Sequence, residues 1–264
     1  MTKTHITRII PVLFIKNGLI VRSQFFKRHQ IIGNVIDQAS RLNDWNADEL
    51  IYIDISRDKF YDSRRDDIRV KSKKNIIDII KEISKVCFMP ISVGGNIRTV
   101  EDALIRIRNG ADKIIINYLL FNDLNTLKKI ITILGTQAVV GSLDYKIING
   151  SAIIHTNYGT ESKAITLKNM AKRCEDFGVG ELFLQNIDLD GSAKGFDIEN
   201  IKSVVEKVNI PVIACSGAGS INHFVEAVNI DHLFAVAAGN IFNFKERAYP
   251  MIKEELKDRS INVR

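Results

Sequence analysis

Carboxylate, amide and glycine residues follow short apolar runs throughout this sequence, and they are the residues that could carry chemistry. A carboxylate such as Asp144 can transfer a proton, because its surroundings tune its pKa. Glycine lets the backbone approach a ligand closely, and the free amides of a helix that begins just after it can bind phosphate. The polar and glycine residues that follow the runs include Asp54, Gly95, Asn96, Asn117, Asp144, Asp190, Gly191, Gly217, Gly239 and Asn240.

Each of these residues also has a purely structural interpretation. Asp144 could cap a helix or pair with a basic residue of a loop, and Asp190 followed by Gly191 is also an ordinary turn sequence. A single glycine pair most often makes a tight turn between a strand and a helix. Glycine-bearing turns recur at matching places in both halves of the chain, and this favours two phosphate sites, one in each half.

The apolar runs are short, rich in β-branched residues and without polar alternation, which is typical of buried parallel strands. Segments with helical spacing lie between them, such as 75–83 and 100–107, the latter followed by Gly110 as a stop signal. No GxGxxG turn follows the first run, so the alternation predicts an α/β protein, a (β/α)8 TIM barrel with its reacting groups at the carboxyl ends of the strands. The runs cover residues 9–15, 49–55, 90–93, 113–116, 138–143, 181–184, 211–214 and 233–237.

The two halves of the sequence match in register, which supports a barrel made of two half-barrel repeats. Residues 12–16 align with 142–146, and residues 90–95 align with 211–216. With 264 residues, 45% of them apolar, the chain is long enough for one large core. We expect a single barrel domain over residues 1–264.

Charge and cysteine content exclude several classes of function. The formal net charge of +6 comes from 37 basic and 31 acidic residues spread along the chain, which does not indicate nucleic-acid binding. Cys87, Cys174 and Cys215 have neither a disulfide-framework nor a zinc-ligand spacing. The apolar run 9–15 is too short for a membrane span or a secretory signal. We therefore expect a cytoplasmic protein that binds no membrane, no metal and no organic cofactor.

The sequence resembles the cyclase subunit of imidazole glycerol phosphate synthase over nearly its whole length. The resemblance rests on blocks that occur in the family's order, at residues 8–11, 47–50, 93–95, 110–113, 188–191, 217–219 and 260–264. In that family the subunit receives ammonia from a glutaminase partner through the barrel. It converts a phosphoribosyl-formimino carboxamide ribonucleotide into imidazole glycerol phosphate and an aminoimidazole carboxamide ribonucleotide. The resemblance therefore implies a heterodimer with a glutaminase subunit and a phosphorylated small-molecule substrate.

The resemblance also implies roles for individual residues. Family members carry four charged residues at the amino-terminal mouth, where ammonia enters, and the matching residues here are Arg8, Glu49, Lys113 and Glu181. Without the resemblance, these would be structural ion pairs on the stability face of a barrel. One of the family's two catalytic aspartates matches Asp144, and Asp54 is a further candidate for substrate binding. The family's phosphate contacts match Gly95 or Asn96, Asn117, Asp190, Gly191, Gly217, Gly239 and Asn240.

Phe14 stands where the family has its other catalytic aspartate. A phenyl ring cannot transfer a proton, and general acid or base catalysis contributes about 10²- to 10⁴-fold. Further departures are Asn96 in place of a glycine, Gln185 with Asn186 in place of two small hydroxyl residues, and a long charged segment at 57–74. The loss of the first aspartate resembles a divergent branch of the family found with surface-polysaccharide genes. That branch implies ammonia delivery for an acetamidino group on a nucleotide-linked sugar, usually with a separate amidating enzyme.

Three alternatives stay open from the sequence. The histidine-pathway reaction and polysaccharide amidination are not ranked against each other. The barrel could instead be a non-catalytic ammonia conduit and activator of a glutaminase, which Phe14 favours and the phosphate-type turns disfavour. It could also be a sugar-phosphate isomerase of the sibling half-barrel family. Phe14 and the four charged residues at the amino-terminal mouth disfavour this. Whether Lys16 or Arg22 closes over a substrate is a further hypothesis.

Overall fold

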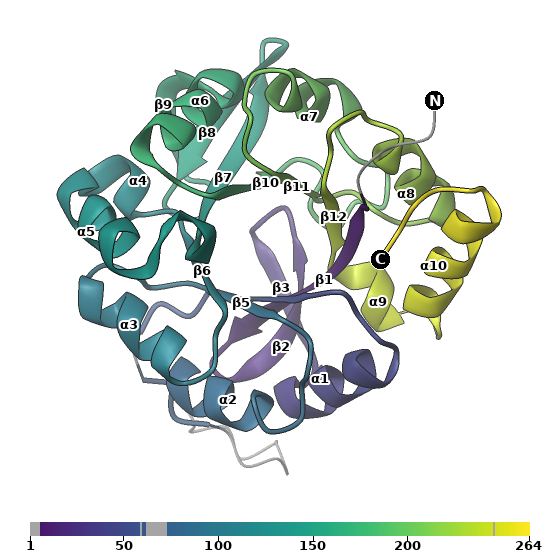
Figure 1. The fold of residues 1–264 in the computed structure, drawn as a ribbon, viewed down its shortest axis with the longest axis horizontal. Coiled ribbons are helices and arrows are strands. Elements are labelled where there is room, and N and C mark those ends of the chain that lie inside the picture. Colours follow the sequence, from purple (N-terminus) through teal and green to yellow (C-terminus); the bar gives the residue numbers. More distant parts are fainter. Residues whose placement is uncertain (1–5, 59, 62–72, 245) are drawn as a thin grey trace.

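A closed barrel of parallel strands forms the centre of the computed structural model, which describes residues 6–58, 60–61, 73–244 and 246–264 (Figure 1). Each strand pairs in parallel with the next around the ring, and the last pairs with the first, so the sheet closes on itself. The predicted (β/α)8 TIM barrel is confirmed. Its strands are β1 (Arg8–Lys16), β4 (Leu50–Asp54), β5 (Ile91–Gly94), β6 (Lys113–Ile116), β7 (Val139–Ile148), β10 (Glu181–Asn186), β11 (Val212–Cys215) and β12 (Ala235–Ala238).

Helices form the outer ring of the molecule. The reciprocal hydrogen bonds of Thr99 and Asp102 start the helix at 100–108, and Gly110, with φ of +118°, follows its end. No helix in the described part of the chain is long and apolar enough to cross a membrane. The helices are α1 (Val35–Asp44), α2 (Ile76–Ile83), α3 (Val100–Arg108), α4 (Leu119–Asn122), α5 (Leu124–Leu134), α6 (Leu167–Phe177), α7 (Ile198–Val205), α8 (Ile221–Val228), α9 (Asn240–Phe244) and α10 (Ala248–Asp258), with a 3₁₀ turn η1 (Thr136–Ala138).

Side chains of the barrel strands alternate between two apolar cores, because successive residues of a strand point to opposite faces. The outer core lies between the strands and the helices and includes Leu42, Ile79 and Phe224. The inner core fills the barrel, so the barrel is a packed structure whose polar ends stand out as possible sites. The inner core consists of Ile10, Val12, Phe14, Val21, Ile51, Ile115, Val140, Phe183, Ile213, Cys215, Ala235 and Ala237.

Two antiparallel hairpins extend the barrel sheet, one in each half. β2 (Leu19–Gln24) and β3 (Arg28–Asn34) follow β1, and β8 (Ser151–Thr156) and β9 (Glu161–Thr166) follow β7. Most of residues 18–33, which belong to none of the predicted strands, form the first hairpin. Polar residues interrupt its strands, which therefore lack the continuous apolar run of a buried parallel strand. Each half has the same order of elements, which supports the half-barrel repeat.

The remaining differences from the sequence prediction lie at strand ends and in one long segment. β7 continues to Ile148, beyond the predicted end at 143, because its last residues pair with β8 outside the barrel. Of the charged segment 57–74, residues 59 and 62–72 lie outside the described residues. Tyr61 N donates to Lys74 O at 2.9 Å, so residues 61 and 74 lie side by side.

Candidate active site and ring of charges

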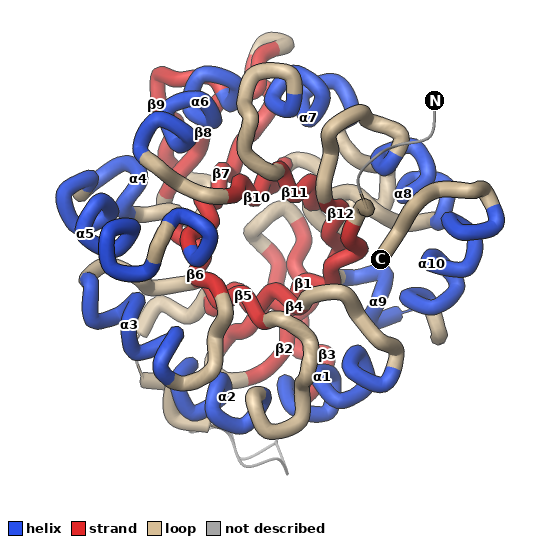
Figure 2. The backbone as a smooth tube through the Cα atoms, in the orientation of Figure 1, coloured by secondary structure: helices blue, strands red, loops and turns tan. Residues whose placement is uncertain are grey.

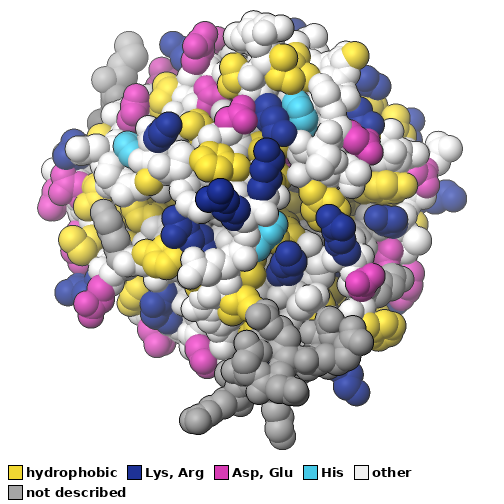
Figure 3. Space-filling model, turned by 180° about the vertical axis from the view of Figure 1, so that it is seen from behind, with side chains coloured by type: hydrophobic (Ala, Val, Ile, Leu, Met, Phe, Trp, Pro, Cys, Tyr) yellow, Lys and Arg dark blue, Asp and Glu magenta, His cyan; other side chains and the backbone are white. Residues whose placement is uncertain are grey.

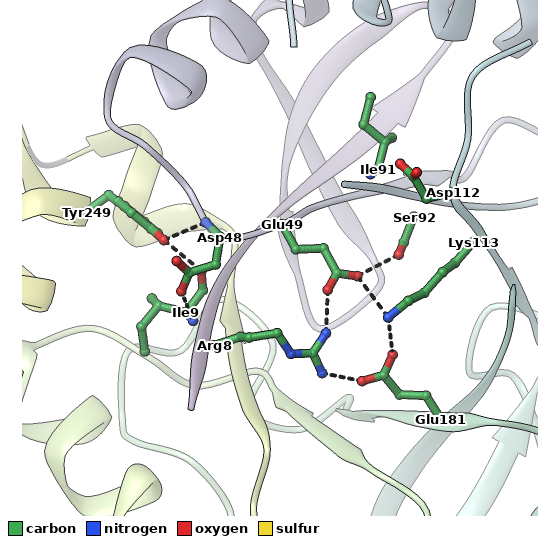
Figure 4. A network of polar contacts seen from close by, with 10 residues as sticks. All are labelled: Arg8, Ile9, Asp48, Glu49, Ile91, Ser92, Asp112, Lys113, Glu181 and Tyr249. Carbon is green, nitrogen blue, oxygen red and sulfur yellow. Dashed lines mark hydrogen bonds and ion pairs between the residues drawn. The ribbon is translucent and has the colours of Figure 1, made fainter. Parts of the chain in front are cut away.

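Four charged side chains meet at the amino-terminal end of the barrel and form a closed ring (Figure 4). Arg8 opens β1, Lys113 opens β6, Glu181 opens β10, and Glu49 directly precedes β4. Arg8 forms ion pairs with both Glu49 and Glu181. Lys113 Nζ lies 2.7 Å from Glu181 Oε2 and 3.7 Å from Glu49 Oε1. The structure therefore brings together all four residues that the resemblance implied as a gate.

This charge ring carries two positive and two negative side chains and is largely buried. The side chains of Glu49 and Glu181 are 3% and 6% exposed, and those of Arg8 and Lys113 are 18% and 23% exposed. Burial lowers the pKa of Arg8, but Glu181 and Glu49 outweigh it and raise the pKa above its usual value. Ser92 Oγ also donates to Glu49 Oε1 at 2.7 Å. Each of the four charges therefore has an oppositely charged partner. Such pairing allows charged groups to stay ionised when they are removed from water.

Asp144 lies at the opposite, carboxyl-terminal end of the barrel in a cluster of polar side chains. Its Oδ1 accepts hydrogen bonds from Gln185 Nε2 at 3.1 Å and from Ser142 Oγ at 3.4 Å. Asn117 Nδ2 donates to Ser142 O at 3.0 Å and lies 3.4 Å from Asp144 Oδ2. These residues belong to β7 and β10 and to the end of β6, which are neighbours in the sheet. The structure thus joins the predicted residues Asp144 and Asn117 and adds Ser142 and Gln185.

The surroundings of Asp144 suit it to proton transfer. Burial raises its pKa to about 7, which outweighs the lowering by the hydrogen bonds from Gln185 and Ser142. The negative charge of Asp190 raises the pKa further. A carboxyl group whose pKa lies near neutral pH can both give and take a proton during a reaction. Asp144 is therefore the best candidate in this mouth for a general acid or base.

Phe14 makes the facing side of the same mouth apolar. It is 8% exposed and belongs to the inner core of the barrel, together with Val21 of the β2–β3 hairpin. β1 carries no acidic residue at all, so this strand offers no carboxylate to match Asp144. A ligand in the mouth would meet a phenyl ring on the β1 side and a polar cluster on the β7 side.

Asp190, Gly191 and Asn240 meet around the turn of the first hairpin. Asp190 Oδ2 accepts from Ser23 Oγ at 2.6 Å and from Phe26 N at 3.2 Å, and Asn240 Nδ2 donates to Ser23 O at 3.1 Å. A side chain at Gly191 would overlap that same carbonyl oxygen. Figure 2 shows the hairpin turn behind the opening of the ring of strands. These three predicted ligand residues are thus brought together, and in this structure they hold the hairpin across the mouth.

Gly95 and Asn96 form a tight turn after β5, next to Asp54. A side chain at Gly95 would overlap the carbonyl oxygen of Asp54, and Asn96, with φ of +52°, donates to Ser56 O at 2.8 Å. Asp54 alternates with inward-facing residues of β4 and so points toward the helices. Its two carboxylate oxygens accept from Ser56 N and Tyr61 Oη, both at 2.9 Å. The structure therefore does not bring the Asp54 side chain to Asp144, and its role in substrate binding stays a prediction.

Gly217 and Gly239 follow the last two barrel strands. Gly217 has φ of +91°, and a side chain there would overlap the carbonyl oxygen of Gly195. A side chain at Gly239 would lie 3.8 Å from the Phe14 ring. Close backbone packing therefore explains Gly217 by itself. Phosphate binding at these turns is compatible with the geometry and stays a prediction.

Comparison with known proteins decides the family. A family model described as "Histidine biosynthesis protein" matches residues 8–248, which is most of the chain. The chain belongs to this family. Imidazole glycerol phosphate synthase subunit HisF of Chlorobaculum parvum is 34% identical over 257 residues, 97% of this chain and 98% of that protein. Subunits of the same name from Saccharolobus solfataricus and Sulfurisphaera tokodaii are 34% and 35% identical over the same shares. The resemblance to the cyclase subunit is confirmed.

The sequence of this histidine biosynthesis family member did not reveal that Ser142 donates to Asp144. It showed Gln185 only as a departure from the family pattern. Both face the barrel interior, Ser142 two residues before Asp144 and Gln185 two residues after Phe183. Alternation along each strand could have found them, because every second residue shares a face. Arg22, which was considered as a residue that might close over substrate, has its guanidinium 5.2 Å from the centre of the Phe244 ring.

Proposed function

We propose that this chain is the synthase subunit of a glutamine amidotransferase and uses ammonia from a glutaminase partner on a phosphorylated substrate. One observation carries the proposal: a buried charge ring closes one end of the barrel, and the other end holds Asp144, whose pKa burial raises to about 7. Inward-facing charges at the amino-terminal end are not needed for chemistry at the carboxyl-terminal end. They make sense if a small molecule enters between them.

Ammonia that enters at the charge ring would cross an apolar interior. Ile10, Ile51, Val140 and Phe183 belong to the inner core that lies between the ring and Asp144. Neutral ammonia crosses such an interior far more readily than ammonium, because burying an unpaired charge is very unfavourable. We infer that the ion pairs of the ring part to admit ammonia, and that the glutaminase binds over this end of the barrel.

Positive charge at the carboxyl-terminal face supports an anionic substrate. Lysine and arginine side chains gather around the middle of this face, where the strands end (Figure 3). The formal net charge of +6 adds a weak general attraction for anions. Together with the glycine turns after β5, β11 and β12, this favours a substrate that carries phosphate groups.

Phe14 indicates that the usual ring closure of the family is not the task of this chain. Asp144 would act without a carboxylate from β1, and a lost general acid or base lowers the rate by about 10²- to 10⁴-fold. We infer that the ammonia serves to form an acetamidino group on a nucleotide-linked sugar for surface polysaccharide, with a separate amidating enzyme. Imidazole glycerol phosphate formation in histidine biosynthesis is the second candidate, favoured by the named relatives.

Turnover of the phosphoribosyl-formimino substrate with free ammonia at high pH tests the proposal, because free ammonia replaces the glutaminase. The unmodified chain is compared with Phe14→Asp. The control is Phe14→Asn, because asparagine has the shape of aspartate but no carboxylate. Turnover by Phe14→Asp but not by the unmodified chain would show that the rest of the site is intact. It would support amidination of a nucleotide-linked sugar as the task of the unmodified chain. Ready turnover by the unmodified chain would assign the histidine-pathway reaction. If no folded variant turned over this substrate and the unmodified chain bound no phosphorylated ligand, the synthase role would be wrong and the conduit would be supported.

The gate is tested by Lys113→Met in the complex with the glutaminase. Methionine keeps most of the length of the side chain but removes its charge, so Arg8 would remain as the cation that pairs with Glu49 and Glu181. We expect the ratio of glutamine-driven to ammonia-driven turnover to fall severalfold. Lys85→Met, at a side chain 67% exposed, is the control. An unchanged ratio in Lys113→Met would remove the gate assignment.

A further inference from the structure

Gln185 has one polar atom that the protein leaves unused. It lies on β10 in register with Asp144 on one side and Cys215 on the other, and it is 4% exposed. Its Nε2 donates to Asp144 Oδ1 at 3.1 Å. Its Oε1 is buried and has no hydrogen-bond partner among the described residues. Buried acceptors are nearly always satisfied, because burial removes the water that would otherwise bind them.

The unused acceptor belongs to the interior of the barrel. Glu181 and Phe183 face inward on the same strand, and alternation places Gln185 on that face as well. In the described part of the chain, five other buried side-chain atoms lack a hydrogen-bond partner. None of them belongs to a residue that faces inward next to Asp144. Those atoms are Thr7 Oγ1, Arg22 Nε, Arg41 Nε, Tyr52 Oη and Arg106 Nε.

The contact with Asp144 fixes which way the amide of Gln185 points. When Asp144 is ionised it only accepts hydrogen bonds, so the NH2 group of Gln185 then faces Asp144 and Oε1 faces away from it. The nearby interior side chains Phe14 and Cys215 contain no strong donor that could satisfy Oε1. The result is an inward-facing acceptor without a partner among the described residues, next to a carboxyl group whose pKa is about 7.

We propose that Gln185 Oε1 binds an N–H group of ammonia where ammonia leaves the apolar interior beside Asp144. This inference rests on the proposed function and names the residue that receives the nitrogen. A neutral amide oxygen accepts an N–H group and favours ammonium less than a carboxylate would, so the nitrogen can keep its lone pair free. A second carboxylate would favour the charged form instead. Asp144 accepts another N–H group, and the two acceptors together orient the lone pair toward the mouth.

Ammonia itself is the probe for this site, followed by NMR on the full chain with labelled glutamine and aspartate side chains. At a pH where ammonia is largely neutral, a titration should shift the carboxamide resonance of Gln185 and saturate, whereas sodium chloride at equal ionic strength should not. Gln185→Met has a similar length and no acceptor, and Gln137→Met alters an exposed glutamine as the control. We expect the Asp144 carboxyl resonance to respond to ammonia in the control but not in Gln185→Met.

Kinetics separate this inference from the proposed function. In an ammonia-driven reaction, Gln185→Met should raise the KM for ammonia on the order of tenfold and leave the KM for the phosphorylated substrate unchanged. Gln185→Glu keeps an oxygen but adds charge, so it should bind ammonium and move the response to lower pH. Unchanged ammonia binding and KM in Gln185→Met would overturn the inference while the proposed function stands. Saturable binding that depends on Gln185, in a chain that turns over no substrate, would keep the inference and overturn the function.

Discussion

Phe14 and Asp144 occupy matching positions in the two halves of the barrel. Each faces the mouth near the end of a long strand, and each pairs with the following hairpin, Phe14 with Val21 and Asp144 with His155. The repeat therefore sets a phenyl ring in one half against a carboxyl group in the other. Two carboxylates at these positions could divide acid and base roles between them. In this chain Asp144 must carry out both roles or the reaction must need only one.

Asp144→Asn should make stability less dependent on pH. The pKa of Asp144 is raised to about 7 in the folded chain, against about 3.9 when unfolded. Between these values the folded state holds a proton that the unfolded state has lost, so this group lowers the free energy of unfolding as pH rises from about 4 to about 7. Asparagine does not titrate, so Asp144→Asn removes this contribution to the pH dependence. Allowing for partial contact with water, we expect Asp144→Asn to gain about 1–3 kcal/mol over the unmodified chain at pH 8.

Urea unfolding at a series of pH values measures this effect. The difference in unfolding free energy between the two chains should be small near pH 4, grow toward neutral pH and then level off. A difference that stays constant over this range would show that Asp144 does not titrate differently in the folded chain. The same variant should lose ammonia-driven turnover if Asp144 transfers the proton.

At the scale of elements, the β2–β3 hairpin acts as a cover that is fixed at its turn. Phe25 N donates to Asp190 O at 3.1 Å, so the turn is joined to the loop after β10 by backbone as well as side-chain contacts. A methyl group at Gly159, in the turn of the second hairpin, would lie 3.7 Å from the Phe26 ring. The two hairpins thus approach each other over the mouth. Residues predicted to bind phosphate take part in these contacts, so ligand binding and hairpin position are expected to be coupled.

Ser23→Ala should loosen the first hairpin without unfolding the barrel. Ser23 is 3% exposed and donates to a buried carboxyl group, and such hydrogen bonds contribute about 1.5–3 kcal/mol. We expect backbone amides of β2 and β3 to exchange at least about tenfold faster, because local opening becomes easier. Ser162→Ala, at an exposed position of β9, is the control. Hydrogen exchange followed by mass spectrometry makes the measurement, and unchanged exchange in β2 and β3 would show that Asp190 does not hold the hairpin.

Gly217→Ala and Gly150→Ala distinguish close packing from backbone conformation. Both glycines have positive φ, +91° and +78°, and alanine in that region is unfavourable by about 1–2 kcal/mol. At Gly150 the new methyl group meets open space, so only this term applies. At Gly217 it would overlap the Gly195 carbonyl oxygen, and overpacking brings the expected loss to about 2–5 kcal/mol. Equal losses in urea unfolding would show that the loop at 195 moves away without difficulty.

At the scale of the whole molecule, the charge ring joins both halves of the barrel. Arg8, Glu49 and Lys113 come from the first half and Glu181 comes from the second, so the ring bridges strands far apart in the sequence. The same four side chains close the amino-terminal end of the interior. The stability of the barrel and the proposed passage of ammonia would therefore depend on one set of contacts, so opening of the ring would cost free energy.

Arg8→Met should destabilise the whole barrel. It removes one of the two cations of the ring, the one that forms ion pairs with both buried carboxylates through its guanidinium, and breaking a buried ion pair in this way costs about 3–5 kcal/mol. Arg108→Met removes an ion pair whose side chains are 64% and 69% exposed, and it should cost less than about 1 kcal/mol. Unfolding free energies of both variants make the comparison. Losses of similar size would mean that the ring is not an important source of stability.

The sequence predicted the barrel well because its signals are local. Eight short apolar runs separated by helical segments leave few arrangements other than a closed parallel sheet, and strand 113–116 is observed with the predicted bounds. The hairpins were missed because their strands carry polar residues such as Arg22 and Lys163. Their pairing depends on attachment to β1 and β7, which no local pattern reveals.

The sequence by itself determined which residues stand at the strand ends, and hence Asp144 and Asn117 as candidates, and the family resemblance added the four charges. It also determined that Phe14 breaks the match to the family. Only the tertiary structure decided how these side chains use their hydrogen bonds. In it Asp54 accepts from Tyr61, Asp190 accepts from Ser23, and Gln185 Oε1 has no partner among the described residues. The physical reason is that residue type and order specify which face of a strand a side chain occupies, whereas a hydrogen bond depends on groups that meet only when distant strands pack together.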